Sequence, residues 1–150
     1  MKSLILNEEW VERFKTYAVK HGKEHDESYT SKNDMEQFVL GDKNPTMLIA
    51  DDEEQKILGV ASLIYHSYFL RGKRSRLRLF HCLKSNPHWK QGYEMLTVFV
   101  RETLKKSQLD HAFLFIPLKE TETLNYFELL YKTKEKRWEL ISKWILSLKR

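Results

Sequence analysis

A polar turn near the middle of the chain has the residue types of an anion-binding site. The segment 86–92, NPHWKQG, follows the apolar run Leu77–Leu83 and contains Pro87 and Gly92, which favour a turn. From Tyr93 onward apolar residues recur at helical spacing, so a strand, a turn and a helix are predicted in that order. Such a junction presents backbone N–H groups and the positive end of a helix dipole. The segment therefore predicts a site for an anion such as phosphate.

Cys82 and the pair His21 and His25 could also do chemistry, but neither is interpreted as a functional site. Cys82 is the single cysteine and lies inside the apolar run, where a small buried side chain is expected rather than a nucleophile. One cysteine excludes an internal disulfide and suits a reducing cytoplasm. His21 and His25 are four residues apart, which suits a metal on one continuous helix. Gly22 interrupts that helix, so exposed histidines and no metal site are expected.

A basic run precedes the central strand. The segment 71–78, RGKRSRLR, holds five basic residues among eight, and the whole chain has a formal net charge of +5. Two interpretations stay open: a nucleic-acid contact, or a hairpin turn whose charges are solvated. No aromatic cluster surrounds these arginines in the sequence, as a base-stacking platform would require. The solvated turn is therefore the preferred interpretation.

Length and composition indicate one ordinary domain. The chain has 150 residues, of which 41% are hydrophobic and 31% charged, so a single domain over residues 1–150 is expected. No apolar run approaches the ~20 residues that cross a bilayer. The N-terminal stretch MKSLILNEEW has acidic residues too early for a secretory signal. A cytoplasmic protein without membrane association is predicted.

Hydrophobic periodicity predicts an alternation of helices and strands. The last segment, residues 134–150, matches either a helix or strands, and a strand pair turning near Ser142 fits better if the segment closes a sheet. Asn7 is a suitable N-cap for the first helix, and Gly22 a suitable end. The predicted helices are Glu8–His21, Ser31–Leu40, Tyr93–Lys106 and Thr123–Tyr131, and the predicted strands are Thr46–Ala50, Ile57–Phe69, Leu77–Leu83 and His111–Leu118.

Three stretches resemble one known family. ILGVASLIYHS (residues 57–67), LKSNPHWKQGYEML (83–96) and FLFIPLKETETLNYFELLYKTK (113–134) resemble the third strand, the pyrophosphate loop and the fifth strand with its following helix in the GNAT superfamily of acyl-CoA-dependent N-acyltransferases. Together with the order of the predicted elements, these three stretches extend the resemblance over nearly the whole chain. It implies an α+β fold: a mostly antiparallel, twisted sheet of about six strands with splayed fourth and fifth strands, flanked by about four helices.

The sequence departs from the family pattern at two motifs. The family loop is written Arg/Gln-x-x-Gly-x-Gly/Ala, because small residues let backbone N–H groups approach a pyrophosphate closely. Here Gly92 remains, residues 93–95 (YEM) stand at and around the second small position, and Lys90 or Gln91 could replace the Arg/Gln. In the later helix Phe127 aligns with the family's tyrosine general acid, and Tyr126 precedes it.

The resemblance implies an N-acetyltransferase in which an amine attacks the thioester of acetyl-CoA directly. The protein would supply positioning, a base for the ammonium proton and polarisation of the carbonyl. Some family members carry a base on the fourth strand, where His81 stands, and imidazole suits proton acceptance near neutral pH. Tyr126 is the implied acid for the departing thiolate. His66 and His88 are alternative bases, and core packing is the alternative interpretation of His81 and Tyr126.

By the same resemblance, acetyl-CoA is held along the fourth strand and the turn. Backbone groups would pair with the pantetheine arm, and backbone N–H groups would carry the pyrophosphate beside one lysine. The implied residues are Leu83, Lys84 and Ser85 for the arm, and Lys90, Gln91, Gly92, Tyr93, Glu94 and Met95 for the pyrophosphate.

Three functions stay open at this level. The order of elements favours an acetyltransferase acting on an amine of unknown identity, the altered loop favours a GNAT-like binding or regulatory domain, and the basic run favours a nucleic-acid-binding protein. The basic turn and the phosphate turn are predicted at opposite ends of one strand, which disfavours the third. A homodimer through the terminal strands is compatible with such folds. The residues that either line an acceptor pocket or pack in the core are Trp10, Tyr29, Tyr65, Tyr68 and Trp144.

Overall fold

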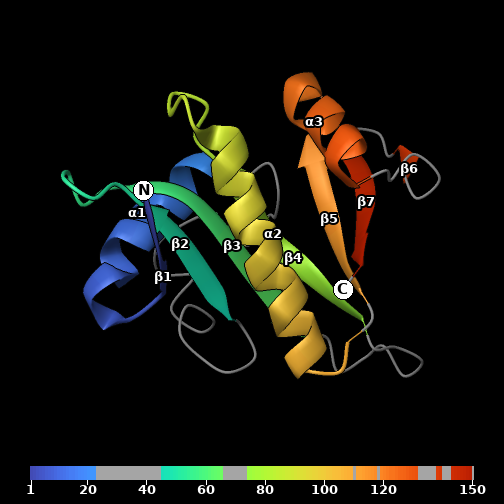
Figure 1. Cartoon of the computed structure of the whole chain (residues 1–150), viewed down its shortest axis with the longest axis horizontal. Coiled ribbons are helices and arrows are strands. Elements are labelled where there is room, and N and C mark those ends of the chain that lie inside the picture. The colour runs from blue at the N-terminus through green and yellow to red at the C-terminus, as the bar shows by residue number, and fades with distance from the viewer. Residues whose placement is uncertain are drawn as a thin grey trace.

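The architecture is a seven-stranded sheet with helices on both faces (Figure 1). The computed structural model describes residues 1–22, 45–65, 74–109, 111–117, 119–131, 138–139 and 143–149. In chain order the elements are β1 (Lys2–Ile5), the 3₁₀ turn η1 (Glu8–Trp10), α1 (Val11–His21), β2 (Thr46–Ala50), β3 (Ile57–Tyr65), β4 (Arg74–Cys82), α2 (Trp89–Lys106), β5 (His111–Pro117), α3 (Thr121–Tyr131), β6 (Trp138–Glu139) and β7 (Lys143–Lys149).

The sheet has the order β1-β2-β3-β4-β5-β7-β6. All neighbouring strands run antiparallel except β4 and β5, which are parallel. The parallel pairing extends from Arg74↔His111 to Leu77↔Leu114 and then stops. β4 runs on to Cys82 and β5 to Pro117, so the two strands diverge toward the end where α2 and α3 begin (Figure 1). The predicted mixed sheet with splayed fourth and fifth strands is confirmed.

The two faces of the sheet are covered by different helices. Met47 and Ile49 of β2 belong to the core that α2 covers through Leu96, Val100 and Leu104. The intervening β2 residues belong to the core on the opposite face, together with Trp10, Phe14, Tyr17 and Ala18 of η1 and α1. Successive residues of a strand point to opposite faces, and here both faces are apolar because both are covered.

Local sequence explains how η1 begins and how α1 ends. The Asn7 side chain accepts a hydrogen bond from the Glu9 N–H at 3.0 Å, and the carboxylates of Glu8 and Glu9 stand in the turn that follows. The Gly22 N–H closes the last turn of α1 on the Ala18 carbonyl, which confirms the predicted end. The predicted start at Glu8 is a 3₁₀ turn capped by Asn7, and α1 itself starts at Val11 without a side-chain cap.

Glycines let α2 and β3 approach Cys82 closely. A methyl group on Gly59 of β3 would lie 2.7 Å from the Cys82 Sγ, and one on Gly92 of α2 would lie 3.0 Å from it. Both distances are too short for an ordinary contact, so the sulfur fills the space that two absent side chains leave. The predicted role of Cys82 as a small buried residue is confirmed.

Several boundaries differ from the sequence prediction. α2 begins at Trp89 rather than Tyr93, because the helix continues back through the glycine-containing segment that suggested a turn. β1 was not predicted: it is only four residues long, and its pairing with β2 is a long-range contact. The antiparallel pairing of β6 with β7 confirms the strand pair near the C-terminus.

Some predictions fall on residues that the structure does not describe. These are the helix Ser31–Leu40, the end of the third strand beyond Tyr65, and the side chains of His25, Tyr29, Tyr65, His66, Tyr68 and Trp144. In the part of the chain that is described, no helix has the length and apolar character needed to cross a membrane.

Candidate functional site

The end of β4 has two different environments, one on each side of the strand. His81 belongs to the side of α1, and Phe80 and Cys82 belong to the core beneath α2. Because neighbouring residues of a strand alternate in direction, one strand supplies both a polar cluster and an apolar one. The polar cluster contains the histidine that sequence indicated as a base.

His81 is held by a tyrosine from the first helix. The Tyr17 hydroxyl lies 2.6 Å from the His81 Nδ1 and 3.4 Å from the His81 carbonyl oxygen. Either group can donate in the 2.6 Å contact, because the direction depends on the tautomer of His81. When Tyr17 donates to the carbonyl, Nδ1–H donates to Tyr17 and the lone pair lies on Nε2. The two contacts are therefore compatible with a proton acceptor at Nε2.

A second histidine, His21, lies against this pair. Its ring stacks on the His81 ring with centroids 5.1 Å apart and an interplanar angle of 18°, and its centroid is 4.7 Å from that of Tyr17. Sequence reasoning did not place His21 in the site. Tyr17 and His21 are four residues apart on one helix, which puts them on one face, but nothing local indicated that β4 would supply His81.

Tyr17 stays protonated in this setting. Burial raises the pKa of the Tyr17 phenol well above its usual value, and the nearby Cys82, Tyr93 and Glu120 raise it further. A neutral phenol can donate one hydrogen bond and accept another, which is compatible with the two contacts with His81.

Two lysines stand around the start of α2. Lys84 and Lys90 are exposed, and their Nζ atoms lie 5.7 Å and 5.5 Å from the centroid of the Trp89 ring. Lys84 also lies 3.9 Å from a carboxylate oxygen of Glu122 in α3. The positive end of the α2 dipole adds to their charge, so this corner of the molecule suits an anion.

The backbone of this corner is less free than the sequence suggested. The Leu83 N–H donates to the Leu58 carbonyl at 2.8 Å, and the Leu83 carbonyl accepts from the Asn86 N–H at 3.2 Å. The Gly92 N–H donates to the His88 carbonyl at 3.0 Å. The N–H groups of Leu83 and Gly92 are thus used within the protein, and the contacts of these residues with acetyl-CoA stay a prediction.

The earlier start of α2 also changes the role of the residues around Gly92. Lys90 and Gln91 stand in the first turn, where N–H groups have no carbonyl partner within the helix. Tyr93, Glu94 and Met95 stand in the second turn, where N–H groups normally bond within the helix. The predicted turn at these residues is therefore helix, and the use of their backbone N–H groups for a pyrophosphate stays a prediction. Lys84 and Ser85 are exposed in the turn before α2.

An aromatic cluster lies beneath the start of α2, beside the diverging strands. Tyr93 is fully buried, and its ring centroid lies 4.8 Å from that of Phe127 and 5.4 Å from that of Phe80. Trp89 and Tyr126 complete the cluster. The Tyr93 hydroxyl and the Thr123 hydroxyl are both buried, and the Tyr93 hydroxyl lies near Thr123 and the Cys82 backbone. Burial raises the pKa of the Tyr93 phenol well above its usual value. The cluster fills the space between α2, α3 and β4.

Tyr126, the acid that the resemblance implied, spans α3 and α2. Its hydroxyl donates to the Lys90 carbonyl at 3.0 Å and lies 3.3 Å from a carboxylate oxygen of Glu94. Burial, followed by the nearby Glu94 carboxylate, raises the pKa of Tyr126 to about 12. The phenol is therefore protonated at neutral pH, as a proton donor must be.

The remaining sequence candidates have structural surroundings. Arg76 and Arg78 belong to β4 rather than to a turn, are half-buried, and have buried Nε atoms, so the prediction of simply solvated charges is wrong for both. Trp10 is 4% exposed and packs in the core with Phe14. Among the described residues, no three of His, Cys, Asp or Glu lie close enough to hold a metal together.

Solved structures with this arrangement are known. The PaiA N-acetyltransferase of Thermoplasma acidophilum, in complex with coenzyme A, matches with 16% identity and a TM-score of 0.69 over 100% of both chains. A GNAT-family acetyltransferase of Staphylococcus aureus matches with 15% identity and a TM-score of 0.66 over 99% of this chain and 100% of that one. A chimeric spermidine N-acetyltransferase from Vibrio cholerae matches with 7% identity and a TM-score of 0.63, over 99% and 95%.

The likeness is visible in structure and not in sequence. No protein-family model and no curated protein matches the sequence. The two matching structures align with this chain over 99–100% of its length. The chain therefore has the fold of the GNAT acetyltransferases.

Proposed function

We propose that the protein is an N-acetyltransferase that moves an acetyl group from acetyl-CoA to an amine. The observation that carries the proposal is the divergence of β4 and β5 beside the N-terminus of α2. The solved Thermoplasma acidophilum enzyme of the same fold is in complex with coenzyme A, which supports coenzyme A as the partner of this corner. Exposed cations and a helix N-terminus suit its phosphates.

Each part of the reaction has a candidate group in the chain. Lys84, Lys90 and the first-turn N–H groups of α2 would hold the phosphates. His81 would take the ammonium proton at Nε2, and the contact of Nδ1 with Tyr17 would orient the imidazole. The amine nitrogen then forms the new C–N bond, the C–S bond breaks, and the thiolate takes a proton. Tyr126 is the proposed proton donor to the thiolate.

The test is thiol release from acetyl-CoA with a panel of amines, together with calorimetric titration of coenzyme A. We expect binding and release for the natural protein, and a loss of about 10²- to 10⁴-fold in kcat for His81→Gln, because a positioned base contributes that much. Lys105→Ala, at an exposed position in the last turn of α2, is the matched control and should keep full activity. A natural protein that neither binds coenzyme A nor releases thiol would refute the proposal.

A second function is favoured by the aromatic cluster. Tyr93 and Phe127 are fully buried beside the diverging strands, where a pantetheine arm would have to insert. This packing favours a GNAT-like domain that binds coenzyme A weakly and acts as a binding or regulatory module. Thermal shift with coenzyme A separates the two functions: the module predicts no shift for the natural protein and a shift for Tyr126→Ala, which opens the cluster at its rim. Thiol release by the natural protein would exclude the module.

A further inference from the structure

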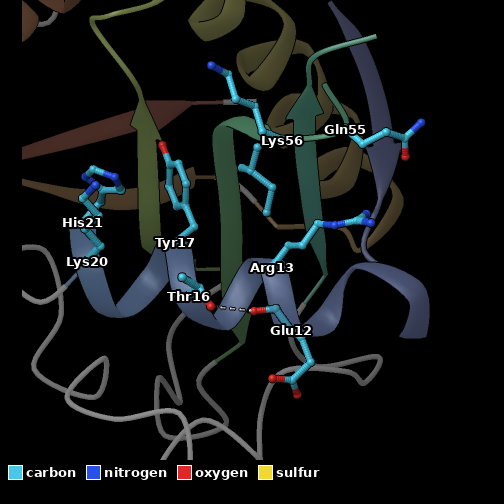
Figure 2. Close-up of a pocket in the computed structure, with 9 residues that line it drawn as sticks. Glu12, Arg13, Thr16, Tyr17, Lys20, His21, Gln55 and Lys56 are labelled. Atoms are coloured by element: carbon cyan, nitrogen blue, oxygen red, sulfur yellow. Dashed lines mark hydrogen bonds between the residues drawn. The ribbon is translucent and has the colours of Figure 1, made fainter. Parts of the chain in front are cut away.

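A pocket lies on the α1 side of the sheet, away from α2. It has a volume of about 500 Å³ and lies between α1 and the turn that joins β2 to β3 (Figure 2). Tyr17, Lys20 and His21 line it from α1, and Gln55 and Lys56 line it from the turn. Sites for small molecules commonly have about this volume.

The inner wall of this pocket touches the proposed base. Tyr17 and His21 line the pocket, and the same two side chains contact His81 through the 2.6 Å hydrogen bond and the stacked ring. Charged groups near the end of β4, including Glu120, also act on the Tyr17 phenol. A molecule in the pocket therefore lies one side chain away from His81.

The rim of the pocket is mainly cationic. Arg13, Lys20 and Lys56 line it, and Glu12 is the carboxylate among its lining residues. Glu12 faces the Lys15 ammonium at 3.6 Å, and Lys56 faces Glu54 at 2.9 Å. These pairs reduce the charge that Glu12 and Lys56 present to a ligand.

Arg13 is positioned more firmly than an ordinary surface arginine. Its guanidinium carbon lies 4.4 Å from the centroid of the Trp10 ring, and Trp10 is buried. Stacking on an aromatic ring orients the guanidinium plane and leaves its N–H groups at the edge available. Two N–H groups at the edge of a guanidinium match the two oxygens of a carboxylate or of a phosphate. Lys20 adds a second, exposed cation to the same wall.

We propose that the pocket binds the acceptor, and that the acceptor is a small amine that also carries an anionic group, a carboxylate or a phosphate. Lys20 binds the anion, Arg13 stands at the other end of the rim as a second cation, and the amine points past Tyr17 toward His81 (Figure 2). The proposal rests on the proposed acetyltransferase function and adds the class of acceptor to it. A polyamine would place its positive charges against this cationic rim, so polyamines are disfavoured.

The first test compares acceptors at equal concentration in the thiol-release assay. Glutamate carries a carboxylate, phosphoethanolamine carries a phosphate, ethanolamine carries no anion, and spermidine is a polyamine. We expect glutamate or phosphoethanolamine to exceed ethanolamine in kcat/KM by at least about tenfold, the order expected when charge-assisted hydrogen bonds are added. The faster of the two identifies the anion. Preference for spermidine or for ethanolamine would overturn the proposal.

The second test reverses the charge of the rim. Lys20→Glu should raise KM for the preferred anionic acceptor by about tenfold or more, leave kcat nearly unchanged, and improve spermidine. Lys20→Arg should restore the natural KM. Lys105→Glu, an equal charge change on α2, should have no effect on KM. Both positions are exposed, so the fold should be retained, and melting temperatures check this. An unchanged KM in Lys20→Glu would contradict the proposal.

A binding experiment separates failure of this inference from failure of the proposed function. Calorimetric titration with glutamate and with phosphoethanolamine, in the presence of coenzyme A, needs no turnover. Binding that Lys20→Glu abolishes, without thiol release, would retain the anion-binding pocket and reject the transferase. Turnover with acceptors that carry no anion would retain the transferase and reject the pocket assignment. No binding of either probe to the natural protein would also reject the pocket assignment.

Discussion

A buried tyrosine lies on each side of β4, and the surroundings of the two tyrosines differ. On the α1 side the Tyr17 hydroxyl makes a 2.6 Å contact with His81. On the α2 side the Tyr93 hydroxyl is buried near Thr123, and its ring packs against Phe80 and Phe127. A hollow lined by charged residues adjoins the first tyrosine, and close packing surrounds the second. The difference indicates that the α1 side of β4 is suited to catalysis, whereas the α2 side stabilises the fold.

The largest expected effect comes from opening the packed side. Phe127→Ala removes a fully buried ring and should lower the free energy of unfolding by about 3–5 kcal/mol. His21→Ala, on the other side, removes a half-buried ring that lines a hollow, and should cost much less. Urea unfolding followed by circular dichroism measures both. Equal losses in the free energy of unfolding would contradict this difference, since the polar cluster would then contribute as much to stability as the aromatic cluster.

Alkaline pH should destabilise the protein through both tyrosines. Burial raises the pKa of the folded Tyr17 and Tyr93 phenols, so above pH ~10 the unfolded phenols lose protons first and the folded state loses stability. The expected slope is about 1.4 kcal/mol per pH unit for each tyrosine. The free energy of unfolding measured from pH 8 to 11 tests this, with Tyr93→Phe expected to flatten the fall. A flat profile in the natural protein would show that neither phenol is shielded.

The smallest effects compare the two hydroxyl groups. Tyr17→Phe removes the hydrogen bond to His81 and should lower the free energy of unfolding by about 1 kcal/mol. Tyr93→Phe removes a buried hydroxyl that lies near Thr123 and the Cys82 backbone without a well-formed hydrogen bond, so it should lower the free energy of unfolding less than Tyr17→Phe does. Chemical denaturation of the two single variants and the double variant measures both effects. A larger loss in Tyr93→Phe than in Tyr17→Phe would contradict this order.

The proposed function also predicts that substitutions of Tyr17 and Tyr93 affect turnover differently. Tyr17→Phe should slow turnover, because the Nδ1 of His81 loses its hydrogen-bond partner and the ring its orientation. Tyr93→Phe should leave turnover close to natural if the cluster serves packing alone. The pH dependence of kcat/KM for the two variants measures this difference.

Periodicity was a reliable guide to the elements built from local contacts. The apolar stripe of α2 and the end of α1 at Gly22 appear as predicted, and the Asn7 cap begins the 3₁₀ turn before α1. The start of α2 was misplaced because Gly92 was interpreted as a turn residue. In the structure its lack of a side chain serves the contact with Cys82, a contact that only the packing of α2 on β4 creates.

The candidate site was only partly visible in the sequence. His81 was indicated by its place on the fourth strand, but its partner Tyr17 is 64 positions away. No local pattern links two residues at that separation, so neither the hydrogen bond nor the stacked His21 could be inferred. The backbone of Leu83 was expected to be open, and its occupation by Leu58 is likewise a property of strand pairing.

The sequence by itself determined which segments are helices and strands, since a hydrophobic period acts over a few residues and needs no partner. It also determined the resemblance of their order to the GNAT fold. Tertiary structure alone decided which face of β4 is filled and which is hollow. Burial of Tyr93 and the pairing of Tyr17 with His81 depend on helices from distant parts of the chain packing on opposite faces of one strand.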